Sequence, residues 1–567
     1  MASQESGGDD RGAAQKCRVL SGGVLLAALS VVGCGLGDGE SSTACSVRDN
    51  GDGAALVSCP DGRRLVVDDG SLGAASGDRV AASPSPGPSL AGTSCRIAVE
   101  SEMRWIRCDD GTEVLLGPVS SERRHFVLMI GDGMQMAHAV AASRYLYGMD
   151  DDISFLSFPV QTFATTWDVT TYDQYAALFG ADRYDPSHYD PRIGYDPDQG
   201  GPAPYPLVDD TPEQRAYFLP YGSFGPHPDS ASTATAMSTG IKTDSQNLNW
   251  LPGGVEQGAL ETITERLRRT YGMAIGVVST TPFSHATPAG FLAHNPNRFN
   301  YLAIASEVLL TSRPDVLITS GYGTEGGYYQ ADDLAEAQGA PDLEYVERQS
   351  GVTGADALNQ ATNRALRDHK RLFGLFGSDS QGGFESPIPT DTPGAPSVEP
   401  GSSENPTLAQ ASVAALRVLS ENPSGFFLMI EQGSIDWANH ANDFKRMIGN
   451  MWDLDQAVKA VVSFVDQPGD DVDWSNTTLV VTADHANSYL RLPVVLGKGD
   501  LPTQSEGNIY PDGDVTYGSS QHTNELVTVS AMGMAAPALR NYADIYRGLN
   551  IIDDSDLHDL ELQATAR

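Results

Sequence analysis

The stretch "GFFLMIEQGSIDWANH", residues 425–440, joins an apolar run to a glutamate, an aspartate and a histidine. The run "GFFLMI" predicts a buried strand that ends beside Glu431. If the chain turns helical after Gly433, Asp436 and His440 lie on one face of the helix, which suits two ligands of one metal ion. A solvated helix turn would have the same composition, so other strands must decide between the two interpretations.

Three other apolar runs also end in polar residues that could serve a site. They are "HFVLMIGDGM" (125–134) with Asp132, "AIGVVSTTPFSHATPA" (274–289) with His285 and Thr287, and "LVVTADHAN" (479–487) with Asp484 and His485. Strand-like runs alternate with amphipathic helical stretches, which predicts an α/β fold with a central, largely parallel sheet flanked by helices. Because the carboxyl ends of parallel strands share one edge, these polar residues are expected to converge.

A cluster of four carboxylates would repel itself unless a cation lay among them. The histidines His440, His485 and His522, the last from "SSQHTNE" (519–525), add nitrogen ligands to the acids. Zinc accepts such a mixed set, whereas the oxygen-rich portion around Thr287 suits magnesium. The sequence therefore favours a metal centre over four unrelated strand ends.

The segment "PDSASTATAMSTGIKT", residues 228–243, supplies a candidate nucleophile. Asp229 and Ser230 precede a run of small, helix-compatible residues, which places Ser230 at a helix N-terminus that would attract an anion such as phosphate. Both residues could instead merely cap the helix. Arg298, at the end of "HATPAGFLAHNPNR", adds a bidentate donor for a tetrahedral oxyanion.

In their order and approximate spacing, these motifs resemble those of the alkaline phosphatases, over about residues 122–535. The resemblance implies a phosphomonoester hydrolase that releases inorganic phosphate through a phosphoserine intermediate. Ser230 would be the nucleophile and Arg298 would hold the phosphoryl oxygens. It also implies small phosphomonoester substrates and a homodimer.

The resemblance further implies two zinc ions and one magnesium ion. The implied ligands are Asp436, His440 and His522 for the first zinc; Asp132, Asp484 and His485 for the second; and Asp132, Thr287 and Glu431 for magnesium. The chain has His285 where some bacterial members have aspartate, and Trp437 where some have lysine or histidine. Both differences remove charge that could hold water around the third ion or the phosphate, so magnesium is expected to bind more weakly than zinc.

Two other functions share much of this pattern. One is a phosphodiesterase or sulfatase of the same superfamily, although the full magnesium set argues for monoester hydrolysis. The other is a non-catalytic metal- or phosphate-binding surface lipoprotein, against which Ser230 and Arg298 weigh. The chain has 567 residues and a formal charge of −38, and we see no basic patch, so nucleic acid is not expected as a specific partner.

Residues 1–118 are expected to lie outside the catalytic domain. Residues 1–33 have the basic start and short apolar run of a signal peptide, so we expect export to the periplasm or cell surface. The ending "SVVGC" resembles a lipobox, in which Cys34 would carry a lipid anchor and the protein would be a lipoprotein, for example of the outer membrane. Plain secretion is the alternative.

Residues 34–118 contain two similar segments, "ALVSCPDGRRLVV" and "RWIRCDDGTEVLL", separated by a Pro/Ser linker. Their cysteines, Cys45 with Cys59 and Cys95 with Cys108, suggest one disulfide-stapled β-hairpin per copy, although other pairings are possible. Residues 119–567 would form the catalytic domain, with polar inserts at 168–226 and 377–406. The first insert could be a lid or interface arm, or only a solvated loop.

Overall fold

A computed structural model describes residues 123–180, 182–186, 227–377, 382–467, 471–546 and 549–566, together with six short strands between residues 46 and 118. The predicted signal peptide, Cys34 and residues 187–226 of the first insert lie outside the described residues. None of the described helices is both long and apolar enough to cross a bilayer.

The two N-terminal segments each form a three-stranded sheet, one strand more than the predicted hairpin. The first contains β1 (Ser46–Asp49), β2 (Ala54–Ser58) and β3 (Arg64–Asp68), and the second β4 (Cys95–Glu100), β5 (Met103–Cys108) and β6 (Glu113–Pro118). In the antiparallel β4–β5 pair, Cys95 lies opposite Cys108. The backbone register is thus compatible with the predicted pairing of these two cysteines, and the disulfides themselves stay a prediction.

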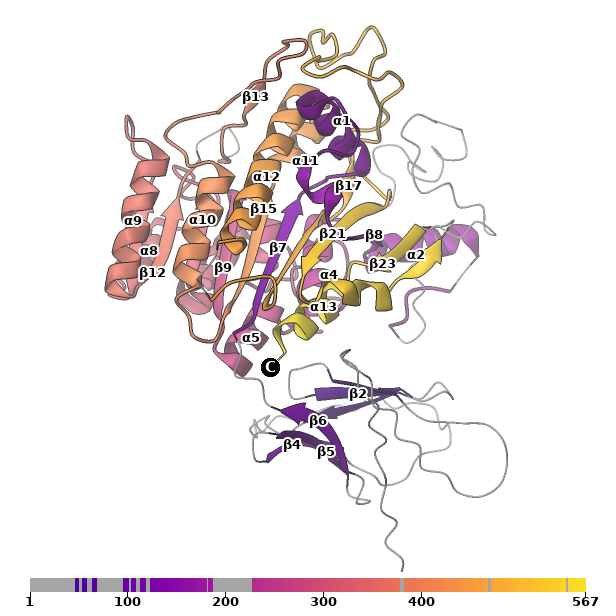
Figure 1. Ribbon diagram of the computed structural model, residues 1–567, viewed down its shortest axis with the longest axis vertical. Coiled ribbons are helices and arrows are strands. Elements are labelled where there is room, and N and C mark those ends of the chain that lie inside the picture. The colour runs from indigo at the N-terminus through magenta and orange to yellow at the C-terminus, as the bar shows by residue number, and fades with distance from the viewer. Residues whose placement is uncertain are drawn as a thin grey trace, which may run out of the picture. The chain divides into compact units, whose positions relative to one another are not determined.

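The rest of the described chain is built on one 11-stranded sheet (Figure 1). Across the sheet its strands are β11 (Leu343–Glu347), β12 (Arg371–Leu375), β10 (Val316–Ser320), β9 (Ala274–Pro282), β15 (Phe426–Gln432), β7 (His125–Gly131), β16 (Thr477–Thr482), β21 (Val527–Gly533), β8 (Val160–Thr165), β23 (Leu549–Asp553) and β22 (Asp544–Tyr546). From β11 to β16 all neighbours are parallel.

Beyond β16 the sheet is mixed, because β21 and β22 run opposite to the other strands, whereas β8 and β23 are parallel neighbours. The expectation of a largely parallel sheet therefore holds for most of its strands. β21 runs antiparallel to both β16 and β8, and β22 is antiparallel to β23. The chain leaves the sheet after Thr482 and re-enters at Val527 on the same edge, which requires the new strand to run in the opposite direction.

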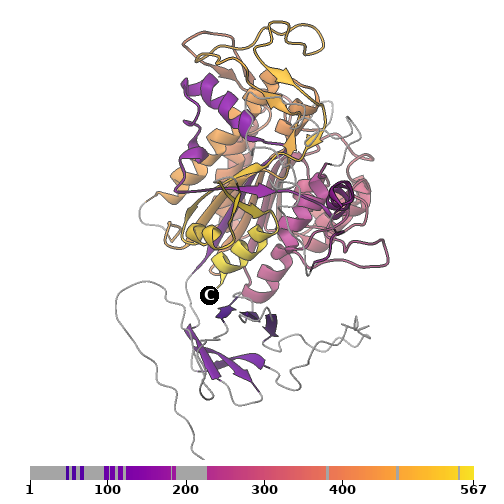
Figure 2. The same ribbon diagram turned by 90° about the vertical axis from the view of Figure 1, so that its right-hand side faces the viewer.

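Helices cover both faces of the sheet (Figures 1 and 2). On one side lie α9 (Gly354–Asp368), α10 (Leu408–Leu419), α12 (Phe444–Val465) and α1 (Met136–Tyr147); on the other lie α4 (Ser230–Thr239), α5 (Ile263–Tyr271) and α13 (Asp556–Thr565). The central strands are therefore buried on both sides. This is why β7 and β15 are continuous apolar runs, without the alternation of a half-exposed strand.

Parts of both predicted inserts have regular structure. The first insert begins with α2 (Val169–Phe179). The side chain of Asp168 caps this helix by accepting a hydrogen bond from the backbone N–H group of Thr171. The second contains a short antiparallel pair, β13 (Ile388–Pro389) with β14 (Val398–Glu399). The hydroxyl of Tyr145 in α1 lies 2.7 Å from the carbonyl oxygen of Thr390, which holds this pair against the helix.

Candidate active site

The predicted site residues meet at the carboxyl edge of four neighbouring strands, β9, β15, β7 and β16. Glu431 of β15 is level with Ile130 of β7, and Thr482 of β16 is level with the same residue. Asp132 and Asp484 therefore each lie two residues beyond one common level of the sheet. The prediction that the strand ends deliver these acids to one place is confirmed by this register.

Asp436, His440 and His522 form the first set of donors. Asp436 and His440 are four residues apart on α11 (Ser434–His440), and their Oδ2 and Nε2 atoms are 3.2 Å apart. His522 Nε2 lies 3.4 Å from Asp436 Oδ1 and 3.1 Å from His440 Nε2. Ligand atoms of a tetrahedral ion with bonds of about 2.0 to 2.1 Å are separated by about 3.3 to 3.4 Å. Each pair in the set comes close to that spacing, with Asp436 offering a different oxygen to each histidine.

The tautomers of the two histidines strengthen this interpretation. His440 Nδ1 lies 2.7 Å from the carbonyl oxygen of Ser520, and His522 Nδ1 lies 2.8 Å from that of Pro228. A carbonyl oxygen only accepts, so both Nδ1 atoms must carry the proton. The two Nε2 atoms then face each other beside the Asp436 carboxylate. Burial alone would lower the pKa of His440, but the charge of Asp436 outweighs it and raises the pKa to about 9, so without a metal a second proton on His440 occupies the place that a cation would take. Backbone carbonyls orient metal-binding histidines in the same way.

Asp132, Asp484 and His485 form the second set. His485 Nε2 lies 3.5 Å from Asp132 Oδ1 and 3.3 Å from Asp484 Oδ2, and all three residues are buried. Asp484 Oδ1 accepts from the backbone N–H groups of Gly133 and His485, at 3.0 and 2.9 Å. Two further carboxylate oxygens, Asp132 Oδ1 and Asp484 Oδ2, are buried without a hydrogen-bond partner. Buried carboxylate oxygens without a donor fit a bound cation.

Glu431 and Thr287 provide further oxygen donors. Glu431 Oε2 accepts from the hydroxyl groups of Ser279 and Thr281 in β9. Its Oε1 atom is buried without a partner, as is Thr287 Oγ1 on the short helix α6 (Ala286–Ala289). Hard, unpartnered oxygen atoms of this kind suit magnesium.

The carboxyl groups strongly influence one another. Burial, followed by the neighbouring carboxylate of Asp484, raises the pKa of Asp132 well above its ordinary value. Burial likewise raises the pKa of Glu431 to about 7 and that of Asp484 to about 6. These shifts mean that the site resists holding all its negative charge, and positive ions would relieve that cost.

Ser230 is the first residue of α4 and lies against the second set. Its Oγ atom is 3.0 Å from His485 Nε2. Asp229 caps the helix by accepting from the N–H group of Ala231, and its other oxygen accepts from Arg298 Nη1 at 2.8 Å. Asp229 thus caps the helix and also orients the arginine. Arg298 is only 6% exposed and its Nε–H group has no hydrogen-bond partner, so this group is available to donate to a bound ligand.

Asn487 is a site residue that the sequence analysis missed. Its amide nitrogen donates to Asp436 Oδ1 at 2.6 Å. It belongs to β17 (Ala486–Asn487), which pairs with β20 (His522–Thr523) and places Asn487 opposite His522. This small ladder joins the two sets, because the rings of His485 and His522 stack with centroids 3.6 Å apart.

His285 and Trp437, expected near the third ion, lie together at the rim. Their ring centroids are 5.8 Å apart in an edge-to-face arrangement. Burial, followed by the charge of Arg298, lowers the pKa of His285 to about 3. The imidazole is therefore neutral at ordinary pH.

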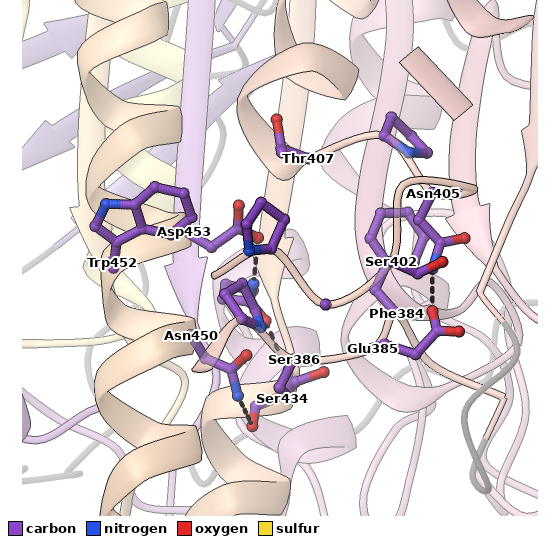
Figure 3. A pocket seen from close by; sticks show the side chains of 15 residues that line it. Phe384, Glu385, Ser386, Ser402, Asn405, Thr407, Ser434, Asn450, Trp452 and Asp453 are labelled. Carbon is purple, nitrogen blue, oxygen red and sulfur yellow. Dashed lines mark hydrogen bonds between the residues drawn. The ribbon is translucent and has the colours of Figure 1, made fainter. Parts of the chain in front are cut away.

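Helix α12 holds the start of α11 in place (Figure 3). Asn450 Nδ2 donates to the carbonyl oxygen of Ser434 at 2.7 Å, and Gln432 Nε2 donates to Asp453 Oδ2 at 2.8 Å. Residues of both elements line the pocket drawn in Figure 3. These bonds fix the turn between Glu431 and Asp436, so the strand-end acid and the helix acid keep their relative positions.

His294 lies between two acids, Glu265 and Glu307. Burial alone would lower the pKa of His294, but hydrogen bonds to Glu265 and Glu307 outweigh it and raise the pKa to about 10. The Nδ1 atom lies 2.7 Å from Glu307 Oε1, and the Nε2 atom lies 3.3 Å from Glu265 Oε2. His294 is therefore charged and bridges two acids, which is a structural role.

We expect His294→Gln to lower the free energy of unfolding by about 2 kcal/mol at pH 6. This value allows for the screening of the ion pair by solvent, because Glu265 is half-exposed. Because the folded pKa is the higher one, the stabilisation is complete below about pH 6.5 and is lost as the pH rises through 10. Chemical denaturation at pH 6 and pH 10 measures the deficit. His369→Asn, at an exposed helix end, is the control, and an equal His294→Gln deficit at both pH values contradicts the prediction.

Comparisons with known proteins agree with the geometry of the site. The sequence model of the alkaline phosphatase family matches residues 221–498. The alkaline phosphatase of Escherichia coli (strain K12) is 30% identical over 342 residues, which cover 54% of this chain and 68% of the relative. Alkaline phosphatase H of Pseudomonas aeruginosa is 29% identical over 376 residues, 57% of this chain and 74% of the relative.

Solved structures show the same fold. The cold-active alkaline phosphatase of a psychrophilic Shewanella aligns with a TM-score of 0.51 at 20% identity, over 78% of this chain and 100% of the other. The alkaline phosphatase of Thermus thermophilus aligns with a TM-score of 0.51 at 19% identity, over 79% and 92%. The chain belongs to the alkaline phosphatase family.

Proposed function

We propose that the protein is a metal-dependent phosphomonoester hydrolase that acts through a phosphoserine intermediate at Ser230. One observation carries the proposal. Ser230 Oγ, at a helix N-terminus, lies 3.0 Å from His485 Nε2, a donor of the second set, while Arg298 is held beside it by Asp229. A nucleophile, a set of zinc-spaced donors and an oxyanion clamp therefore share one place.

The donor sets would hold two zinc ions, and magnesium would be held by Asp132, Thr287 and Glu431. When bound, these ions supply Lewis-acid stabilisation of the attacking and leaving oxygens. Ser230 Oγ attacks phosphorus, the ester oxygen leaves as an alcohol, and a phosphoseryl group remains. Water then cleaves the new ester and releases inorganic phosphate. Throughout, the N-terminal N–H groups of α4 and the guanidinium of Arg298 balance charge on the phosphoryl oxygens.

The decisive experiment compares p-nitrophenyl phosphate, bis-p-nitrophenyl phosphate and p-nitrophenyl sulfate, with and without a chelator. We expect the monoester to be hydrolysed fastest, the chelator to abolish the activity, and added zinc to restore it. Preference for the diester or the sulfate would point to the other enzymes of this superfamily. Absence of hydrolysis of all three by the zinc-loaded protein would leave a metal- or phosphate-binding protein.

We expect His285→Asp to tighten magnesium binding by about 10-fold, because a carboxylate adds negative charge and water-ordering acceptors where His285 is neutral. Magnesium titration of both dialysed forms, followed by activity and by metal analysis, measures the change. Equal apparent affinity in the two forms would show that His285 does not control this site. Trp437→Phe, which adds no charge to the same rim, is the matched control and should leave the affinity unchanged.

A further inference from the structure

Five rings form a continuous aromatic cluster at the rim of the site, which we call the aromatic shelf: His285, Phe299, Tyr301, Tyr328 and Trp437. The centroids of Tyr301 and Tyr328 are 4.9 Å apart, and the Tyr301 ring stacks on His285 at 5.9 Å with an angle of 8°. Phe299 meets Tyr301 edge-to-face at 6.2 Å. With the His285–Trp437 contact, the shelf runs without interruption from the Arg298 loop to α11.

Both ends of the shelf adjoin residues of the proposed chemistry. At one end, the guanidinium carbon of Arg298 lies 5.7 Å from the centre of the Phe299 ring. At the other end, Trp437 directly follows Asp436 in α11. A phosphoryl group held by Arg298 would thus have aromatic surface beside it.

The shelf is accessible, unlike most aromatic side chains of the described core. Phe299 is 53% exposed, whereas Phe283 and Phe291 in the same part of the chain are fully buried. Tyr301, Tyr328 and Trp437 are half-buried. Packing against their neighbours fixes these rings, so an incoming flat group would meet a surface that is already ordered and would lose little entropy on binding.

We infer that the aromatic shelf binds the base of a nucleoside monophosphate while Arg298 holds its phosphate. The inference rests on the proposed monoesterase function and narrows its substrate class. A flat heteroaromatic base stacks on Phe299 and Tyr301, an interaction that an aliphatic leaving group cannot make. Such stacking is sequence-tolerant, so purine and pyrimidine nucleotides both fit. Long polynucleotides remain disfavoured by the strongly acidic chain.

The test compares AMP with ribose 5-phosphate, which both release phosphate from a primary 5′-oxygen and differ only in the adenine base. We expect kcat/KM to be about 10-fold higher for AMP, with the difference mainly in KM. Phe299→Ala should bring the ratio of the two kcat/KM values close to one, while Phe299→Trp should preserve it. The control is Val495→Ala, at an apolar residue that is 73% exposed and has no place in the site; it should leave both values unchanged.

Calorimetric titration with adenosine and with ribose separates failure of this inference from failure of the proposed function. If neither ester is hydrolysed but adenosine binds more tightly than ribose, and Phe299→Ala removes that difference, the shelf is a base-binding surface on a protein that is not a monoesterase. If both esters are hydrolysed with equal kcat/KM, or if Phe299→Ala leaves the preference intact, the inference is overturned. Equal binding of adenosine and ribose overturns it as well.

Discussion

Ser230→Ala is expected to lower the turnover of p-nitrophenyl phosphate by at least about 1,000-fold while the metal content stays normal. The hydroxyl is the proposed covalent acceptor, and its removal eliminates the route through a phosphoseryl ester. The donor sets do not depend on it, because their mutual distances involve only carboxylates and imidazoles. Steady-state kinetics and metal analysis of the same preparation provide the measurement.

Arg298→Ala is the comparison for this variant. Losing a charge clamp costs about 2 to 4 kcal/mol of transition-state stabilisation, which is milder than losing the nucleophile. The Arg298→Ala variant should still form the phosphoseryl enzyme, whereas Ser230→Ala should form none. Near wild-type turnover in Ser230→Ala would contradict the covalent mechanism, independently of the result for Arg298→Ala.

Asp436→Asn is expected to cost about 100-fold or more in activity and to lose one equivalent of zinc. This carboxylate lies within 3.2 Å of His440 Nε2 and 3.4 Å of His522 Nε2, so it is the only anionic member of the first donor set. An amide keeps the shape of the side chain but removes the charge that balances a divalent ion. Zinc content and activity, measured across a zinc titration, report both effects.

Asn487→Ala is a milder variant with which Asp436→Asn can be compared. Its amide donates to Asp436 Oδ1 without belonging to the donor set, so its loss should weaken zinc by about 10-fold and leave activity recoverable at high zinc. If Asp436→Asn kept its full zinc content at low zinc concentration, the first donor set would not be a metal site. Equal behaviour of the two variants would mean that Asn487 does more than orient the aspartate.

The predictable part of the site is the part that lies close to an apolar run. Asp132 and Asp484 follow their strands within two residues, and parallel strands bring their ends to one edge, so these residues could be anticipated together. Asp436 and His440 share a helix face by their four-residue spacing alone. In each case a local pattern and a general rule of sheet geometry were sufficient.

The missed features all depend on contacts between distant segments. Asp229 was interpreted only as a possible cap, since no periodicity connects it with Arg298, which lies 69 residues away. Asn487 reaches Asp436 only through the turn of β17 onto β20. The antiparallel strand β21 was also not anticipated, because an apolar run such as Val527–Gly533 does not reveal in which direction its strand runs.

The central position of β7 has a consequence for how the chain is made. This strand leaves the ribosome first among those of the large sheet, yet its partners β15 and β16 follow roughly 300 and 350 residues later. Until then, both of its edges lack their permanent partners, and a strand of five fully buried apolar residues is prone to aggregation. A nascent chain that ends before Thr477 should therefore remain unfolded and depend on chaperones, and the centre around Asp132 should assemble only after nearly the whole chain has been synthesised.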